Sequence, residues 1–361
     1  MKGSDQVFLA WQEIKKNKLR FTLITGILML VSYLVFFLSG LATGLASLNR
    51  EAVDKWEATA IVLTKESDKS LYQSTMSIDE QSELNAKETA VIGQLNAIAN
   101  NGDNKQNVSL FGIKKEEFLM PTITEGMVFE KANEVIADES LKDEGFKLGD
   151  TLTLSSSDQQ LTIVGFTEQA RFNAAPVLYG SLETFHGVKF GEAAAQNEDQ
   201  INGIVVRDDA ASTITKNADL DAIEMETFIE SLPGYTEQKL TLNFMIYFLF
   251  GISSIIVAIF LYVLTVQKIN MFGVMKAQGI SSLYLSKSVV AQTVILAFLG
   301  TAVGFALTLI SGAFLPSAVP VSFDLIEMAI YGMILMVVAT AGAVFSVMTI
   351  VRIDPLKAIG G

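Results

Sequence analysis

The chain has 361 residues, of which half are hydrophobic, and it carries a formal net charge of −13, one histidine and no cysteine. The lack of cysteine excludes disulfides and thiolate metal sites, and a single histidine leaves little material for a catalytic triad or a zinc centre. The acidic excess makes nucleic acid a poor partner.

Residues 1–20 predict an amphipathic helix that lies along the inner membrane surface. Val7, Phe8, Trp11 and Ile14 recur at helical spacing, with polar and charged side chains between them. Trp11 would then lie at the level of the lipid headgroups. The alternative is a positively charged anchor without a membrane-facing side.

Four uncharged stretches are long enough to cross a bilayer, because about 20 apolar residues span its hydrocarbon core. One such stretch could be a buried core helix, but four predict an integral membrane protein. The first is about 28 residues long, whereas the apolar region of a cleavable signal peptide is roughly 7–15 residues, so we expect a retained span. The predicted transmembrane helices are 21–48, 241–267, 288–314 and 328–351.

Basic residues indicate which segments face the cytoplasm. Residues 1–20 carry five basic and two acidic side chains, 268–287 carry three lysines and no acid, and 352–361 carry two basic residues and one acid. The positive-inside rule therefore predicts that both termini and the 268–287 connector are cytoplasmic. The turn 315–327 and the long segment 49–240, with 16 basic and 34 acidic residues, would lie outside.

The segment 49–240 reads as a mixed α+β domain of two lobes. β-branched and apolar runs predict strands at 58–64, 135–137 and 175–179 and a hairpin of 151–154 with 161–166. Short helices are expected after a capping box at Ser77, at 139–144 and at 220–230, and a loop at 195–203. The predicted fold class is an α-helical membrane protein with four transmembrane helices and this extracytoplasmic domain between the first and second.

Motifs for catalysis by this chain are missing from the sequence. It contains no GxxxxGK[ST] phosphate loop, no GxSxG elbow and no HExxH zinc motif. We predict no catalytic residue, and a structural or solvent-facing role for His186. One packing motif is present: Gly40 and Gly44 form a GxxxG pair, which allows close approach of a second copy of the chain or of another span of the same chain.

The layout of one span, a large outer domain and three further spans resembles the FtsX-like (MacB-type, type VII) ABC transporter permeases. The resemblance covers nearly the whole chain. It is most specific in 11–20 (WQEIKKNKLR), 272–281 (FGVMKAQGIS) and 352–359 (RIDPLKAI), and 135–166 is similar to the family's strand-rich outer lobe. Gln278, in place of an apolar residue, and Met271, near a usual Glu or Arg, depart from the family pattern.

The resemblance implies a permease dimer in the bacterial cytoplasmic membrane, surrounded by lipid, with two separate ATPase subunits that bind ATP. It implies no intrinsic cofactor. The connector would be the coupling helix that the ATPase grips. Phe272, Met275 and Gly279 fall on one helix face that could enter a partner groove, and the alternative is a plain cytoplasmic turn. The predicted coupling residues are Phe272, Gly273, Met275, Lys276, Gln278 and Gly279.

In size and number of spans, the chain is most similar to the haem-exporter (HrtB-like and DevC-like) branch of the family. This resemblance implies export of haem from the membrane by mechanotransmission. Methionine and tyrosine are possible haem ligands. The candidate iron ligands are Met29 and Met76, although methionine is also a common core filler. The other candidate haem residues are Tyr33, Phe37, Tyr72, Arg50 and Glu51. The alternatives are a lipoprotein-release or other lipid permease, and a regulator that signals to an envelope protein without transport.

Overall fold

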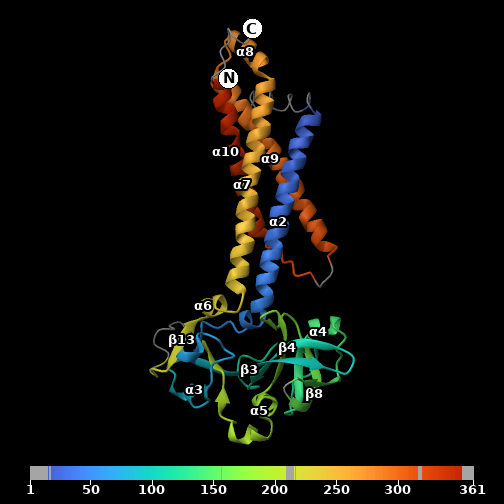
Figure 1. Cartoon of the computed structure of the whole chain (residues 1–361), viewed down its shortest axis with the longest axis vertical. Coiled ribbons are helices and arrows are strands. Elements are labelled where there is room, and N and C mark those ends of the chain that lie inside the picture. The colour runs from blue at the N-terminus through green and yellow to red at the C-terminus, as the bar shows by residue number, and fades with distance from the viewer. Residues whose placement is uncertain are drawn as a thin grey trace. The chain divides into compact units, whose positions relative to one another are not determined.

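The computed structural model describes residues 15, 18–155, 157–208, 215, 217–315 and 319–351. The chain divides into two compact units, a helical unit of Met1–Leu45 with Lys239–Gly361 and an outer unit of Ala46–Gln238 (Figure 1). The predicted amphipathic helix lies outside the described residues except for 15 and 18–20, and the tail 352–361 lies outside them entirely.

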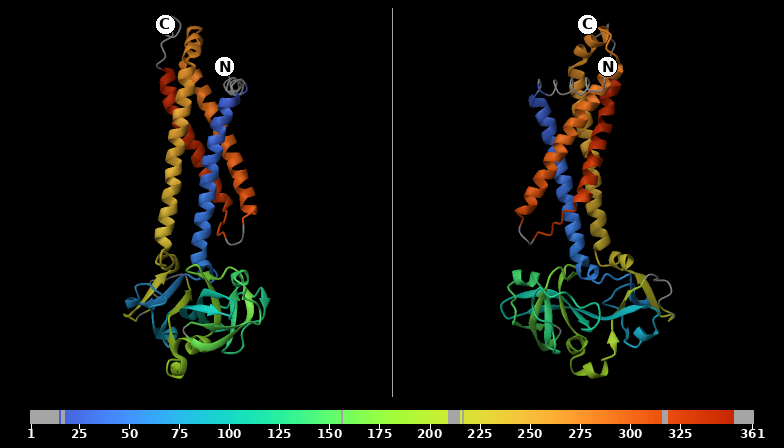
Figure 2. Two further views of the ribbon diagram at one scale, coloured as in Figure 1. Left: turned by 45° about the vertical axis from the view of Figure 1, so that its right-hand side comes forward. Right: turned by 180° about the vertical axis from the view of Figure 1, so that it is seen from behind.

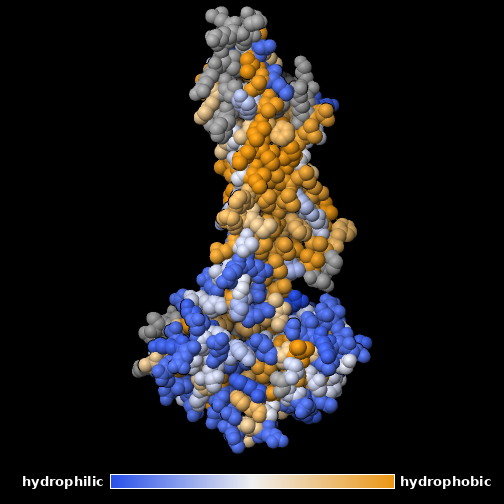
Figure 3. Space-filling model, viewed as in Figure 1, coloured by the Kyte–Doolittle hydropathy of each residue, from blue (hydrophilic) through white to orange (hydrophobic). Residues whose placement is uncertain are grey.

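Long apolar helices form the helical unit, and hydrophobic residues make up most of their described surface on the face shown in Figure 3. Within the described residues, four helices are long and apolar enough to cross a membrane, so the predicted four-span architecture is confirmed. A fifth, short helix, α8 (Ile269–Ala277), connects the second and third. The long helices are α2 (Lys18–Asp54), α7 (Tyr235–Gln267), α9 (Ser282–Ala313) and α10 (Leu325–Val351).

Two glycines of α9 allow it to pack closely on α2. A Cβ added at Gly300 would lie 2.6 Å from the Cβ of Leu28, and one at Gly304 would lie 2.8 Å from the Cβ of Ser32. The pair Gly300–Gly304 is a GxxxG motif, and close backbone approach is its usual role in membrane helices. The sequence contains this motif, but our prediction considered only Gly40 and Gly44.

The outer unit contains one large mixed sheet, which the two predicted lobes share, and a separate two-stranded sheet of β2 and β11. The strand order is β13-β1-β12-β3-β4-β10-β6-β8-β5, and β7 pairs with β3 and β8. The β10–β4 and β6–β8 pairs are parallel. The strands are β1 (Ala60–Thr64), β2 (Met76–Ser77), β3 (Glu88–Asn100), β4 (Lys105–Ile113), β5 (Glu125–Gly126), β6 (Glu134–Asp138), β7 (Thr151–Leu154), β8 (Ser157–Thr167), β9 (Arg171–Phe172), β10 (Ala175–Ser181), β11 (Gln200–Ile201), β12 (Gly203–Arg207) and β13 (Leu220–Glu224), and the helices are α3 (Glu80–Glu83), α4 (Ser140–Asp143), α5 (Leu182–Phe190) and α6 (Met225–Glu230), with 3-10 turns at Lys65–Ser67 and Gly191–Gln196.

Most predicted elements of this unit are confirmed. They include β1, β6, β10, the short helix α4 and the β7–β8 hairpin, whose loop is shorter than expected. The helix predicted over 220–230 is wrong in its first half, which forms β13, and the loop predicted over 195–203 includes β11. The capping box at Ser77 is also wrong, because the residue that caps α3 is Asp79, without a side-chain bond.

The single histidine has a structural position, as predicted. His186 lies in α5, is 4% exposed, and its Nε2 is 2.7 Å from the carbonyl oxygen of Gln200. Buried polar atoms usually need a hydrogen-bond partner, and this backbone oxygen provides one for the imidazole. His186 therefore holds α5 to the start of β11.

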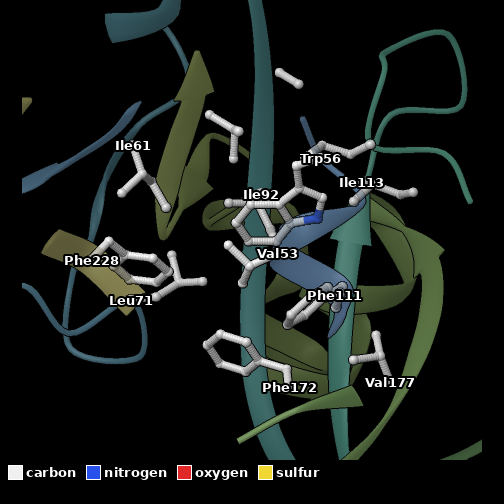
Figure 4. Packing of buried hydrophobic residues seen from close by; sticks show 14 of the residues in the cluster. Val53, Trp56, Ile61, Leu71, Ile92, Phe111, Ile113, Phe172, Val177 and Phe228 are labelled. Carbon is white, nitrogen blue, oxygen red and sulfur yellow. The ribbon is translucent and has the colours of Figure 1, made fainter. Parts of the chain in front are cut away.

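The end of α2 enters the main hydrophobic core of the outer unit. Val53 and Trp56 are each 1% exposed, and the Trp56 ring lies 6.0 Å from that of Phe111, which also contacts Phe172 at 5.3 Å (Figure 4). Burial of apolar area of this kind is the main stabilising contribution in a water-facing domain. The first transmembrane helix is therefore continuous with a segment that is fixed in the outer core.

Candidate coupling element and ligand groove

The connector between the second and third spans is folded as a helix with defined ends. α8 begins directly after α7, and the chain leaves it through Gly279, whose φ of +88° is a left-handed conformation that glycine adopts without strain. Ser281 then caps α9, with its Oγ accepting a hydrogen bond from the N–H of Tyr284 at 3.2 Å. These two features terminate α8 and start α9.

The exposed face of α8 differs from the predicted one. Phe272 is 3% exposed and packs against Leu285 and Val289 of α9, while Met271 and Val274 are 42% and 43% exposed. The prediction that Phe272 enters a partner groove is therefore wrong, because this chain already covers it. Gly273 is also buried and Met275 packs partly against the same cluster, whereas Gln278 and Gly279 are exposed.

Lys276 also has a partner within the chain. Its Nζ donates to the backbone oxygen of Val351 at 3.3 Å, at the end of α10. The last carbonyl groups of a helix have no helical partner, and a cation there is favourable. Lys276, one of the predicted coupling residues, therefore ties α8 to the end of α10.

Gly40 and Gly44 pack against the connection between α9 and α10. A Cβ at Gly40 would overlap the Phe323 ring, and one at Gly44 would overlap the carbonyl group of Pro320. The N–H of Ser322 donates to the Gly40 oxygen at 3.0 Å. The structure therefore favours the alternative of packing within the chain, although by a loop and not by another span, and the dimer contact at these two glycines stays a prediction.

Met29 lines a groove of about 460 Å³ between α2 and α9, the two helices that cross in Figure 2. Its apolar wall consists of Leu296, Leu299 and Val303, and two basic residues, Lys15 and Lys18, also line it. Met29 is half-buried, so its sulfur lies at the edge of the helix packing. The groove combines a soft donor atom, apolar walls and positive charge.

Tyr33 and Phe37, two further candidate haem residues on α2, turn toward different helices. Tyr33 donates from its hydroxyl to Ser311 Oγ of α9 at 3.2 Å, and its ring stacks on Phe37 at 5.9 Å. Phe37 lines a second, apolar groove of about 420 Å³ whose other wall includes Phe244 and Phe248 of α7. Met29 and Phe37, both candidate haem residues, therefore line two different grooves.

Met76 lies in the core of the outer unit. It is 7% exposed and packs with Val62, Val91 and Ile201, and it pairs with Ile201 in the β2–β11 ladder. Its role as a haem ligand stays a prediction, and in this structure neighbouring apolar side chains surround Met76. Tyr72 is 60% exposed, at a polar pocket of about 240 Å³ within the outer unit.

Arg50 is engaged by carboxylates of its own unit. Its Nε donates to Asp54 at 2.8 Å, its two terminal nitrogens donate to Glu226 at 3.2 and 3.1 Å, and one also donates to the Tyr235 hydroxyl at 3.4 Å. In this structure these acceptors occupy the guanidinium of Arg50, and its role as a haem contact stays a prediction. Glu51 is half-buried, and its role as a haem contact stays a prediction.

Two family descriptions match the chain over adjoining ranges. Residues 22–226 match the MacB-like periplasmic core domain, and residues 243–355 match the FtsX-like permease C-terminal region. Together they include α8, most of each of the four spans and most of the outer unit, and leave residues 227–242 between them unmatched. The first match alone covers more than half of the chain.

Full-length relatives carry the name "Putative hemin transport system permease protein HrtB". The protein of Staphylococcus haemolyticus (strain JCSC1435) is 26% identical over 357 residues, which cover 98% of this chain and 99% of the relative. That of Staphylococcus epidermidis (strain ATCC 35984) is 27% identical over 367 residues, with the same coverage.

Among solved structures, the extracellular domain of the noncanonic ABC-type transporter YknZ from Gram-positive bacteria is similar at 13% identity. The likeness covers 45% of this chain and 85% of that chain, with a TM-score of 0.31. The two family matches and the four membrane-spanning helices agree on one class of protein. The chain therefore belongs to the FtsX-like, MacB-type family of ABC transporter permeases, plasma-membrane proteins that work with an ATPase partner.

Proposed function

We propose that the chain is the permease of a hemin exporter, in which two copies pair with two ATPase subunits that bind and hydrolyse ATP. The observation that carries this proposal is the similarity over 98% of the chain to relatives named for hemin transport. The described architecture supports it, because α2 and α7 are long helices whose outer ends, 46–54 and 235–238, belong to the folded outer unit. The permease would transmit motion and would not perform chemistry.

The charge distribution supports an orientation with both termini and α8 in the cytoplasm and the outer unit outside. The segments proposed as cytoplasmic hold 10 of the 26 basic residues but only 3 of the 39 acidic ones. An excess of lysine and arginine marks the cytoplasmic side. In this orientation α8 faces the ATPase.

We place the ATPase contact on the exposed stripe Met271, Val274 and Gln278. These residues are spaced i, i+3 and i+7, so they form one face of α8 and its C-cap. Phe272 lies on the opposite side, in the cluster with α9. The ATPase would therefore bind Met271 and Val274 directly, and Phe272 would transfer the displacement of α8 to α9.

Hemin would bind at the Met29 groove, with the thioether as an iron ligand and the apolar wall of α9 against the macrocycle. Eleven residues separate Met29 from Lys18, which is about 16 Å along a helix. The lysines would thus attract the propionates into the groove and would not hold them while the iron is at Met29. Tyr33 and Phe37 would provide flat surface toward the second groove.

A hemin absorption titration of the purified permease tests this proposal. We expect a saturable Soret shift, and a Met29→Ala variant should weaken hemin binding at least tenfold. Met333→Ala is the matched control, because Met333 is a methionine of α10 that is 55% exposed, and Met76→Ala should also leave affinity unchanged.

An unchanged affinity in Met29→Ala would refute the site, and the absence of any shift in the parent protein would refute hemin as the ligand. In the second case, the lipid-permease and regulator alternatives remain. Capture of an extracytoplasmic protein partner by the permease would then favour the regulator.

A further inference from the structure

The outer ends of α2 and α7 meet in the core of the outer unit. Val53 near the end of α2 and Tyr235 at the start of α7 belong to the same buried cluster, and are 1% and 3% exposed. α6 contributes Phe228 and Ile229 to that cluster. Both helices that enter the outer unit from the membrane are therefore held by one patch of core.

A hinge-like segment separates α6 from α7. Residues 231–234 connect them, and Gly234 has a φ of +76° with open space around its Cα. A glycine in this conformation permits a change of backbone direction that other residues resist. The covalent connection alone therefore leaves the angle between α6 and α7 adjustable.

Arg50 bridges this segment. From α2 its guanidinium donates to Glu226 of α6, before the hinge, at 3.2 and 3.1 Å, and to the Tyr235 hydroxyl of α7, after the hinge, at 3.4 Å. Its Nε is fixed by both oxygens of Asp54 at 2.8 and 2.9 Å. The planar fork of arginine suits this set of acceptors, whereas lysine offers a single point charge.

The exposure of the cluster indicates that folding stability is not its main contribution. The side chain of Arg50 is 24% exposed, and those of Asp54 and Glu226 are 47% and 57% exposed. Ion pairs this close to solvent add little to folding stability. Their geometry still fixes three helix ends relative to one another across a flexible connection.

We propose that Arg50 is a positioning residue that locks α2, α6 and α7 together, so that ATP-driven motion of the two membrane helices moves the outer sheet with them. The proposal deepens the proposed function, since it names the joint through which the permease transmits motion. β13 pairs with β1 and leads into α6, so motion of α6 reaches the edge of the sheet.

Hydrogen exchange of the permease–ATPase complex in nanodiscs, without nucleotide and trapped with ATP and vanadate, tests the proposal. In the parent complex we expect nucleotide-dependent exchange both in 239–267 and in α6. Arg50→Met should keep the change in 239–267 and abolish the change in α6. Lys142→Met is the matched control, because it removes another exposed ion pair of the same unit, with Glu125 at 2.7 Å, away from the hinge.

A covalent rescue distinguishes this role from a loss of folding. The chain contains no cysteine, so Arg50→Cys with Glu226→Cys can be joined selectively by a short bis-maleimide before the ATPase is added. We expect the cross-link to restore the α6 response. An α6 response that persists in Arg50→Met, is absent from the parent complex, or is not restored by the cross-link would overturn the proposal.

This readout needs no hemin. An α6 response in a complex that fails to bind hemin would refute the ligand proposed above and leave the role of Arg50 standing. A complex that binds hemin while Arg50→Met responds like the parent would refute only the role of Arg50. The two proposals can therefore fail separately.

Discussion

Truncation of Phe272 to alanine should unfold α8 locally without destabilising the membrane helices. The side chain is 3% exposed and belongs to a small cluster formed by α8 and the start of α9. Removal of a buried Phe costs about 3–5 kcal/mol in a soluble core, and we take about 3 kcal/mol because this cluster is at the margin of the structure. At about 1.4 kcal/mol for each factor of ten, the open population of α8 should rise roughly a hundredfold.

Hydrogen exchange of residues 269–277, in the permease alone and with the ATPase, measures this effect. Phe272→Ala should lose protection in both samples and bind the ATPase more weakly. Val274→Ala is the control on the exposed face, and it should keep α8 protected while it weakens ATPase binding. Unchanged protection in Phe272→Ala would refute the assignment of Phe272 to the chain's own core.

Three further changes test the packing and charge of both units. Gly304→Leu should lower the melting temperature and the hemin affinity, because the new side chain would separate α9 from α2 beside Met29, at a cost of about 1–3 kcal/mol in stability. Gly251→Leu is the control, because it lies on α7 at a position with open space, and it should change neither quantity. The free energy of unfolding of Trp56→Phe should stay within about 1 kcal/mol of that of the parent protein, because the change deletes a buried Nε1 that has no partner among the described residues. Trp56→Ala should lower the free energy of unfolding by about 3–5 kcal/mol. The N–H groups of Glu130 and Lys131 donate to the Glu134 carboxylate and hold its pKa below the usual value, so the stabilisation is present at neutral pH and disappears as the pH falls through that lowered pKa. The melting temperature of Glu134→Gln should therefore lie below that of the parent at pH 7 and converge with it in acid, and a constant difference would refute the assignment.

The membrane architecture could be predicted from the sequence because its cause is local. A bilayer requires each span to satisfy its own backbone hydrogen bonds and to carry an apolar surface, and both requirements are visible in the uncharged runs that became α7, α9 and α10. The ends of these helices were less predictable. α2 continues to Asp54 and α7 starts at Tyr235, because core packing of the outer unit holds their polar ends in helical form.

β13 shows why the outer unit was harder to predict. Leu220–Glu224 was expected to be helical, but it pairs with β1 along its whole length, with Ile61 opposite Ile223. The partner strand is more than 150 residues away in sequence, and strand preference depends on such pairing more than helix preference does. No local pattern could supply this information.

Prediction of the candidate site from the sequence was limited for a different reason. An apolar face on α8 and a glycine pair on α2 both indicate that something packs there, but the pattern is the same whether the occupant is a partner or the chain itself. Phe272 packs on Leu285 of α9, and Gly44 packs on Pro320. The sequence left a partner and the chain itself open as the occupant of the space beside the glycine pair, and only the tertiary structure shows which segments of the chain pack at both places.

The two proposed activities lie in different units of the chain. Met29 belongs to the helical unit and Arg50 to the outer unit, 21 positions apart in sequence, and they share no contact among the described residues. Effects on stability at sites this distant are usually additive. Export, in contrast, requires both ligand binding and transmission, so loss of either should abolish it. In the Met29→Ala, Arg50→Met double variant we therefore expect additive changes in melting temperature but non-additive changes in transport, as two separable functions imply.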